Sequence, residues 1–248
     1  MSSPKRFSKG VTNVPSNNTM GQLICPDPTL VVTYMEDFLT YDPNDWIITR
    51  SDVALPYNTA GGHVDSTELI SDATDGILTV TLGAVDNNYA FFQAGDSSRA
   101  TAGERFTTIV GKKLWFKARL KNEDADDNDF YAGLFIADTS PVASAPSDGI
   151  MFMNSDGAAT MKGYIYSGST TQGSNTSMGT TADDTYFTVG AHWDGVNAMY
   201  LYFNDNLVYT LDGFTPTTAE LAPSFGIQNG SASAGVLSVD YICVVRER

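Results

Sequence analysis

The sequence predicts an all-β protein, a two-sheet antiparallel sandwich of the jelly-roll type. About a dozen short runs alternate apolar and polar residues, and each run is bounded by Gly, Asp, Asn or Pro. No segment carries an apolar stripe at helical spacing over three turns. The 248 residues and the 42% hydrophobic content suffice for one large β domain with a sizeable core.

Residues 1–33 differ from the rest, and we expect an extended N-terminal arm followed by one jelly-roll domain at 34–248. The arm is rich in Ser, Asn, Pro and Thr and shows no period. Its first 26 residues carry +3 and the remainder carries −18, which together give the net charge of −15. The arm is too poor in apolar residues to form a core alone, so it is either a frayed terminus or an arm that docks on an acidic neighbour. The residues that would dock are Lys5, Arg6, Phe7, Lys9, Val11, Val14, Leu23 and Ile24.

From Tyr34 onward the chain is predicted to be a succession of strands. In chain order these strands are 46–50, 76–82, 87–93, 112–122, 129–138, 148–155, 159–168, 185–194, 197–205, 206–213, 222–230 and 235–245. In the run from Leu114 to Lys121 every second residue is apolar, which is typical of a half-buried antiparallel strand. Residues 167–184 are rich in Gly, Ser and Thr and predict a long exposed loop or an edge hairpin.

The same alternation predicts which side chains form the core. The expected core residues are Phe116, Leu120, Leu134, Ile136, Val189, Trp193, Leu201, Phe203, Val239 and Tyr241. In the last strand the pattern places Cys243 on the apolar face with Tyr241, which favours a buried thiol. A disulfide with Cys25 is the alternative, although two cysteines make no disulfide framework.

Between two apolar runs lie Asn204, Asp205 and Asn206, which could form a ligand site or a turn. A tight hairpin needs positive φ at its tip, and Asn and Asp tolerate this best after Gly. No other acid lies within four residues on either side. We therefore predict a hairpin turn that binds no ligand.

The densest acidic stretch, residues 122–129, was considered as a calcium site. Asp124, Asp126 and Asn128 have the first three spacings of an EF-hand loop, but the sixth position is Asp129 and the twelfth is Phe135. The EF-hand interpretation therefore fails, which leaves a solvated loop or a looser cation site. We predict no metal and no cofactor.

The sequence contains no complete catalytic residue pattern. The two histidines, His63 and His192, have no partner visible in the sequence. His192 falls on the strand face opposite Val189 and Trp193, so we expect it to point to solvent. Glycoside hydrolysis needs two nearby carboxylates, which on one strand means acids at i and i+2 or i+4, and no apolar strand carries them. The sequence therefore predicts no catalytic residues and a protein that is not an enzyme.

Exposed aromatic side chains are the remaining candidates for a binding site. They are Trp115, Tyr164, Tyr166, Tyr200 and Tyr202, which lie on the polar-alternating faces of their strands. Such residues stack on sugar rings, anchor protein interfaces or pack against neighbouring side chains, and the sequence leaves all three roles open.

Net charge excludes several partners. A charge of −15 argues against binding to nucleic acid and to anionic membranes. No apolar run approaches the roughly 18 residues of a membrane span, and the N-terminus lacks the apolar stretch of a signal peptide.

Several strings together resemble virion proteins of tailed phages and, more broadly, the concanavalin A-like, laminin-G-like jelly-roll superfamily. They are "EDFLTYDPNDWIITRS", "KKLWFKARLK", "DFYAGLFIADTSPV", "TYFTVGAHWDGVNAMYLYFNDNLVYTL" and "ELAPSFGIQNGSASAGVLSVDYICVVRER". The strand-turn-strand "YLYFNDNLVYTL" corresponds to the family's W-x-D-G…Y-x-D-G hairpin, with Asp205-Asn206 where Asp-Gly is usual. The resemblance covers about residue 35 to the C-terminus.

This resemblance implies a non-enzymatic structural protein on the capsid surface of a virion, most simply a decoration (cement) protein that bridges capsomers. Its implied partners are the major capsid protein and further copies of itself, in a trimer or dimer. The alternative is a carbohydrate-binding, lectin-like module of a fibre or of the virion surface. A hydrolase is disfavoured by the missing carboxylate pair.

Overall fold

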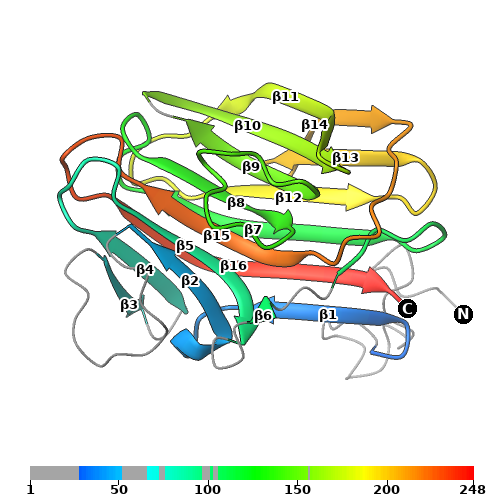
Figure 1. The fold of residues 1–248 in the computed structure, drawn as a ribbon, viewed down its shortest axis with the longest axis horizontal. Coiled ribbons are helices and arrows are strands. Elements are labelled where there is room, and N and C mark those ends of the chain that lie inside the picture. The colour runs from blue at the N-terminus through cyan, green and yellow to red at the C-terminus, as the bar shows by residue number, and fades with distance from the viewer. Residues whose placement is uncertain (1–27, 52–65, 73–75, 97–100, 103–105, 156) are drawn as a thin grey trace, which may run out of the picture.

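The computed structural model describes residues 28–51, 66–72, 76–96, 101–102, 106–155 and 157–248. Two eight-stranded sheets face each other, and every strand pairing that is described is antiparallel (Figure 1). The predicted two-sheet antiparallel sandwich is therefore confirmed. The predicted arm lies almost entirely outside the described residues, as do all eight of its docking residues, so the arm stays a prediction.

The first sheet has the order β14-β13-β12-β7-β16-β4-β3, with β1 paired to β16. Its strands are β1 (Val31–Glu36), β3 (Ser66–Asp72), β4 (Ile77–Leu82), β7 (Leu114–Asn122), β12 (Phe187–Trp193), β13 (Ala198–Phe203), β14 (Asn206–Asp212) and β16 (Val236–Glu247). Strand β16 is central, because it pairs with β7, β4 and β1 along its length.

The second sheet has the order β11-β10-β9-β8-β15-β5-β2, with β6 paired to β5. Its strands are β2 (Trp46–Arg50), β5 (Tyr89–Asp96), β6 (Thr101–Ala102), β8 (Asp129–Phe135), β9 (Gly149–Ser155), β10 (Ala158–Ser167), β11 (Thr170–Thr180) and β15 (Ala222–Gln228). A short 3-10 turn, η2 (Pro43–Asp45), precedes β2. The Gly/Ser/Thr-rich stretch forms the edge hairpin of β10 and β11, which was one of the two predicted alternatives.

The main core lies between the two sheets and is rich in aromatic rings. Phe92 and Phe225 stack with centroids 4.6 Å apart, and Trp46 meets Phe225 edge-on at 5.0 Å. Eight of the ten predicted core residues are buried: Phe116, Leu120, Leu134, Val189, Trp193, Leu201, Phe203 and Val239. The two exceptions are Ile136, which follows the end of β8, and Tyr241.

Tyr241 was misplaced because β16 contains a β-bulge. Val239 pairs with Leu120 while Tyr241 pairs with Arg119, so Asp240 is an extra residue in the ladder. An extra residue exchanges the two faces of the strand beyond it. Ile242 and Val244 consequently enter the core, whereas Tyr241 and Cys243 turn to the outer face and are only partly buried. The prediction that Cys243 is a buried thiol on the apolar face is therefore wrong; it is a free, half-buried cysteine on the outer face.

The segment Asn204–Asn206 is a hairpin turn, as predicted, but its tip is one residue earlier than expected. Positive φ falls on Asn204 (48°) and Asp205 (62°), which is the type I′ pattern, and Asn206 already belongs to β14. The Asn204 side chain also accepts a hydrogen bond from the Thr188 amide at 2.9 Å, which ties the turn to β12.

Candidate functional site

The five predicted exposed aromatics do not form one surface. Tyr164 and Tyr166 lie on β10, on the outer face of the second sheet, in a cluster with Phe91, Tyr131 and Phe135. Most of that cluster is buried, and Tyr166 itself is only 6% exposed. Aromatic packing thus accounts for Tyr166, and its burial raises the pKa of its hydroxyl to about 12.

The other three aromatics share the outer face of the first sheet and are partly exposed. The Trp115 ring stacks on His192 at 5.1 Å, and His192 stacks on Tyr200 at 5.6 Å. These residues lie directly opposite one another on β7, β12 and β13. Because their ring faces are turned toward each other, the three rings stand upright on the sheet in one row, which we call the aromatic wall. His192 therefore does not point freely to solvent, contrary to expectation.

Beside this wall, three basic residues of β7 are each paired with an acid from another segment. Lys117 Nζ lies 2.6 Å from Asp205 Oδ1, Arg119 pairs with Asp240, and Lys121 Nζ lies 2.9 Å from Asp184 Oδ1. Alternation along β7 brings all three bases to the outer face. The pairing acids come from three separate segments, so the sequence pattern of β7 alone could not reveal them.

An open hollow of about 370 Å³ lies at the Lys121 end of this face, and we call it the Tyr186 hollow. Its lining residues are Ile77, Thr79, Lys121, Glu123, Asp184, Tyr186, Val236 and Ser238. The Arg119 guanidinium lies 4.1 Å from the centroid of the Tyr186 ring, a cation–π contact that holds the ring in place. One phenol ring, two carboxylates, one ammonium and the aliphatic hydroxyls of Thr79 and Ser238 therefore line a single hollow.

Lys121 is the charged donor of the Tyr186 hollow. The hydrogen bond to Asp184 raises the pKa of Lys121, and this effect outweighs the opposing effect of burial. Lys121 is consequently a permanent donor with a fixed partner. Glu123 and Asp184 add two negative charges to its one positive charge, so the lining carries a net charge of −1. Such a hollow favours neutral, hydroxyl-rich ligands over anionic ones.

Residues 122–129, the acidic stretch that resembles part of a calcium-binding loop, form hydrogen bonds within their own turn. Asp124 Oδ1 accepts the Asp127 amide at 3.0 Å, and Asn128 is buried and bonded to Asn122 at 3.3 Å. Across the described part of the chain, no group of three His, Cys, Asp or Glu side chains is placed to hold a metal ion. Equally, no helix found there is long and apolar enough to cross a membrane. His63 lies outside the described residues.

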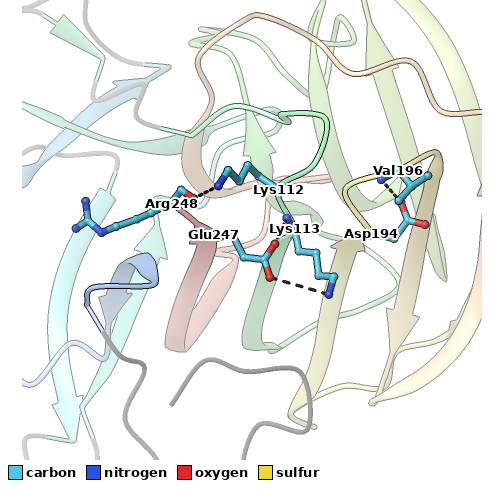
Figure 2. Close-up of polar contacts among 6 residues, drawn as sticks. All are labelled: Lys112, Lys113, Asp194, Val196, Glu247 and Arg248. Atoms are coloured by element: carbon cyan, nitrogen blue, oxygen red, sulfur yellow. Dashed lines mark hydrogen bonds and ion pairs between the residues drawn. The ribbon is translucent and has the colours of Figure 1, made fainter. Parts of the chain in front are cut away.

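Asp194, in the turn between β12 and β13, has a structural role. Its Oδ1 accepts the amide of Val196 at 2.7 Å (Figure 2). The same oxygen accepts the amides of Asn197 and Ala198 at 3.0 Å. Burial opposes the charged form, but these three donors outweigh it and lower the pKa of Asp194. The carboxylate therefore closes the hairpin between β12 and β13.

Figure 2 also shows how the end of β16 is fastened beside that hairpin. Lys113 Nζ lies 4.0 Å from Glu247 Oε1, and Lys112 donates to the Arg248 carbonyl. The Lys113 amide also donates to Glu247 Oε2 at 2.8 Å. The Gly111 amide in turn bonds the Gly195 carbonyl at 2.6 Å. These contacts hold residues 111–113, which lead into β7, against the end of β16 and against the β12–β13 hairpin.

The fold is that of the concanavalin A-like jelly rolls found in lectins and glucanases. Neither family models nor curated proteins match the chain. Among solved structures, the Emp47p carbohydrate recognition domain is similar, with 10% identity and a TM-score of 0.56 over 89% of this chain and 98% of that one. A β-1,3-1,4-glucanase from a mouse hindgut metagenome has 14% identity and a TM-score of 0.55 over 86% of this chain and 98% of that one.

The Bacillus licheniformis β-glucanase is also similar, with 14% identity and a TM-score of 0.55 over 87% of this chain and 97% of that one. This likeness contradicts the prediction that the chain is not an enzyme, because hydrolases share its fold. The prediction rested on two histidines without visible partners and on the absence of acids at i and i+2 or i+4 along one strand. At this identity the likeness concerns the fold and does not establish an activity. The comparisons give no support for a phage origin or a capsid decoration role.

Proposed function

We propose that the chain is a carbohydrate-recognition domain that binds a neutral glycan in the Tyr186 hollow. The observation that carries this proposal is the convergence of an aromatic ring, carboxylates, an ammonium group and hydroxyls in one open hollow. A sugar ring offers an apolar C–H face and vicinal hydroxyls, and it needs both kinds of partner at once.

Each group in the hollow has a distinct task. The C–H face of a sugar packs against Tyr186, whose ring is held by Arg119. Sugar hydroxyls donate to Asp184 and Glu123 and accept from Lys121. Because Lys121 and Asp184 already hold each other at 2.9 Å, they lose little side-chain freedom when the ligand binds.

The fold supports this proposal by analogy only, since one jelly roll serves many functions. The similar structures include domains named for carbohydrate recognition and an enzyme named as a β-1,3-1,4-glucanase. Mixed-linkage β-1,3-1,4-glucan oligosaccharides are therefore the first probes, alongside an array of neutral glycans.

Isothermal titration of these oligosaccharides tests the proposal. We expect Tyr186→Ala to weaken binding roughly tenfold or more, which equals about 1.4 kcal/mol or more. Tyr186→Phe keeps the ring and should retain most of the affinity. Thr218→Ala is the matched control, since Thr218 lines a different hollow of about 450 Å³. Measuring reducing sugar in the same samples shows whether the bound glycan is also cut.

Two results would contradict the proposal. One is that no neutral glycan on the array binds the wild-type protein. The other is that Tyr186→Ala and Thr218→Ala bind a glycan equally well while both unfold at the wild-type temperature. The second result would place the binding site elsewhere on the molecule.

A further inference from the structure

We infer that the outer face of the first sheet is also a self-association surface, on which a second copy of the chain packs face to face. This surface, the aromatic face, lies beyond the Tyr186 hollow, and the inference does not depend on glycan binding. Its residues are Met35, Trp115, His192, Tyr200, Tyr202, Leu207, Cys243 and Val245.

The aromatic face is built from two rows that run across neighbouring strands. One row joins Val245, Trp115, His192 and Tyr200 on β16, β7, β12 and β13. The second row joins Met35, Cys243, Lys117, Gly190, Tyr202 and Leu207, from β1 to β14. At the two ends of the second row Met35 is 53% and Leu207 is 52% exposed. A large apolar residue thus faces solvent at either edge of a partly exposed aromatic centre.

The aromatic centre is already rigid. Trp115, His192 and Tyr200 stack with interplanar angles of 7° and 20°, so each ring holds the next. Covering rings that are fixed beforehand costs little conformational entropy. Trp and Tyr are also the residue types that contribute most to protein interfaces, whereas an upright wall of rings offers few open ring faces to a sugar.

The distribution of charge favours a second copy of the chain as the partner that covers the aromatic face. The chain carries −15, yet Lys117 and Arg119 within this face are each neutralised by an acid, Asp205 and Asp240. The face is therefore locally neutral in an acidic molecule, and two copies that meet there avoid the repulsion that their other surfaces impose. A basic partner would instead be drawn to the acidic surfaces elsewhere.

The size and shape of the face suit a two-fold contact. From β1 to β14 there are five strand spacings of about 4.8 Å, and Trp115 to Arg119 spans about 13 Å. This gives a projected area of roughly 320 Å², below the about 800 Å² per partner of a stable interface, so the contact should be weak and depend on concentration. Two such sheets would pack about 10 Å apart with the same residues on both sides.

Sedimentation velocity over a concentration series tests the inference. We expect the full-length wild-type chain to show a concentration-dependent dimer, and Leu207→Glu to weaken dimerisation roughly tenfold or more. Leu207 is half exposed, so this change should not disturb folding. Val85→Glu is the control, because Val85 is 54% exposed in the turn between β4 and β5 and receives the same charge away from the face.

Cys243 provides a second readout from within the face. In a Cys25→Ser background, the rate at which Cys243 reacts with a thiol reagent should fall as protein concentration rises, and Leu207→Glu should abolish that fall. A wild-type chain that sediments as a monomer throughout would overturn the inference. So would a dimer that Leu207→Glu and Val85→Glu leave equally stable. Neither result bears on glycan titration, so failure of this inference is distinguishable from failure of the proposed function.

Discussion

The bulge at Asp240 leads to opposite predictions for two adjacent residues of β16. Ile242 is fully buried between the sheets, so Ile242→Ala removes core contacts and should cost about 2–5 kcal/mol. Tyr241 lies on the outer face, where it shares a hydrogen bond with Lys117, so Tyr241→Ala should cost about 1 kcal/mol. At about 2–4 °C per kcal/mol for a chain of this size, Ile242→Ala should lower Tm by roughly 4–20 °C.

Thermal unfolding of the two variants, followed by circular dichroism at one low protein concentration, checks this prediction. Low concentration keeps self-association from adding to the stability of the wild type. Simple alternation along β16 reverses the order, because it places Tyr241 inside. If Tyr241→Ala lowers Tm more than Ile242→Ala does, the bulge and the assignment of the two faces are wrong.

Three further predictions concern stability and reactivity. Asp205→Gly should leave Tm within about 2 °C of wild type, because relief of positive φ offsets an exposed ion pair worth about 0–1 kcal/mol; a larger fall would show that the Lys117 pair matters more. Burial opposes ionisation of Asp148, but hydrogen bonds from Thr217, Gly168 and Ser147 prevail and lower its pKa. Its contribution to stability is complete above the unfolded pKa of about 4 and is lost as pH falls toward the lower folded pKa. Asp148→Asn should therefore flatten the decrease in Tm between about pH 5 and about pH 2, and an unchanged decrease would refute this assignment. Burial raises the pKa of the Cys243 thiol, so at neutral pH a dilute sample of the Cys25→Ser variant should react more slowly with iodoacetamide than a free cysteine does; an equal or faster rate would refute it.

The strand pattern predicted most of the fold because one face of most strands is buried. Along β7 and β12 every second side chain enters the core, and alternation identified Phe116, Leu120, Val189 and Trp193 correctly. The pattern failed where the register changes, as at Asp240, because an inserted residue leaves no mark in composition. It also failed on the second sheet, where Tyr166 alternates like a surface residue but is buried against a second cluster.

The Tyr186 hollow could not be found from the sequence because its groups come from distant segments. Thr79 lies on β4, Lys121 on β7, Ser238 on β16 and Asp184 in the segment before β12. Only the antiparallel pairing of β7 with β16 and β12, and of β16 with β4, brings these four side chains together. A spacing pattern along one strand cannot reveal this hollow, because its groups come from four separate segments.

The most direct test of the account is a crystal structure of the protein soaked with a glycan that binds in solution. We predict that the sugar lies against the Tyr186 ring, with hydroxyls bonded to Asp184 and Lys121. A sugar bound instead on the outer face of the second sheet, beside Tyr89 and Tyr164, would contradict the assignment of the site.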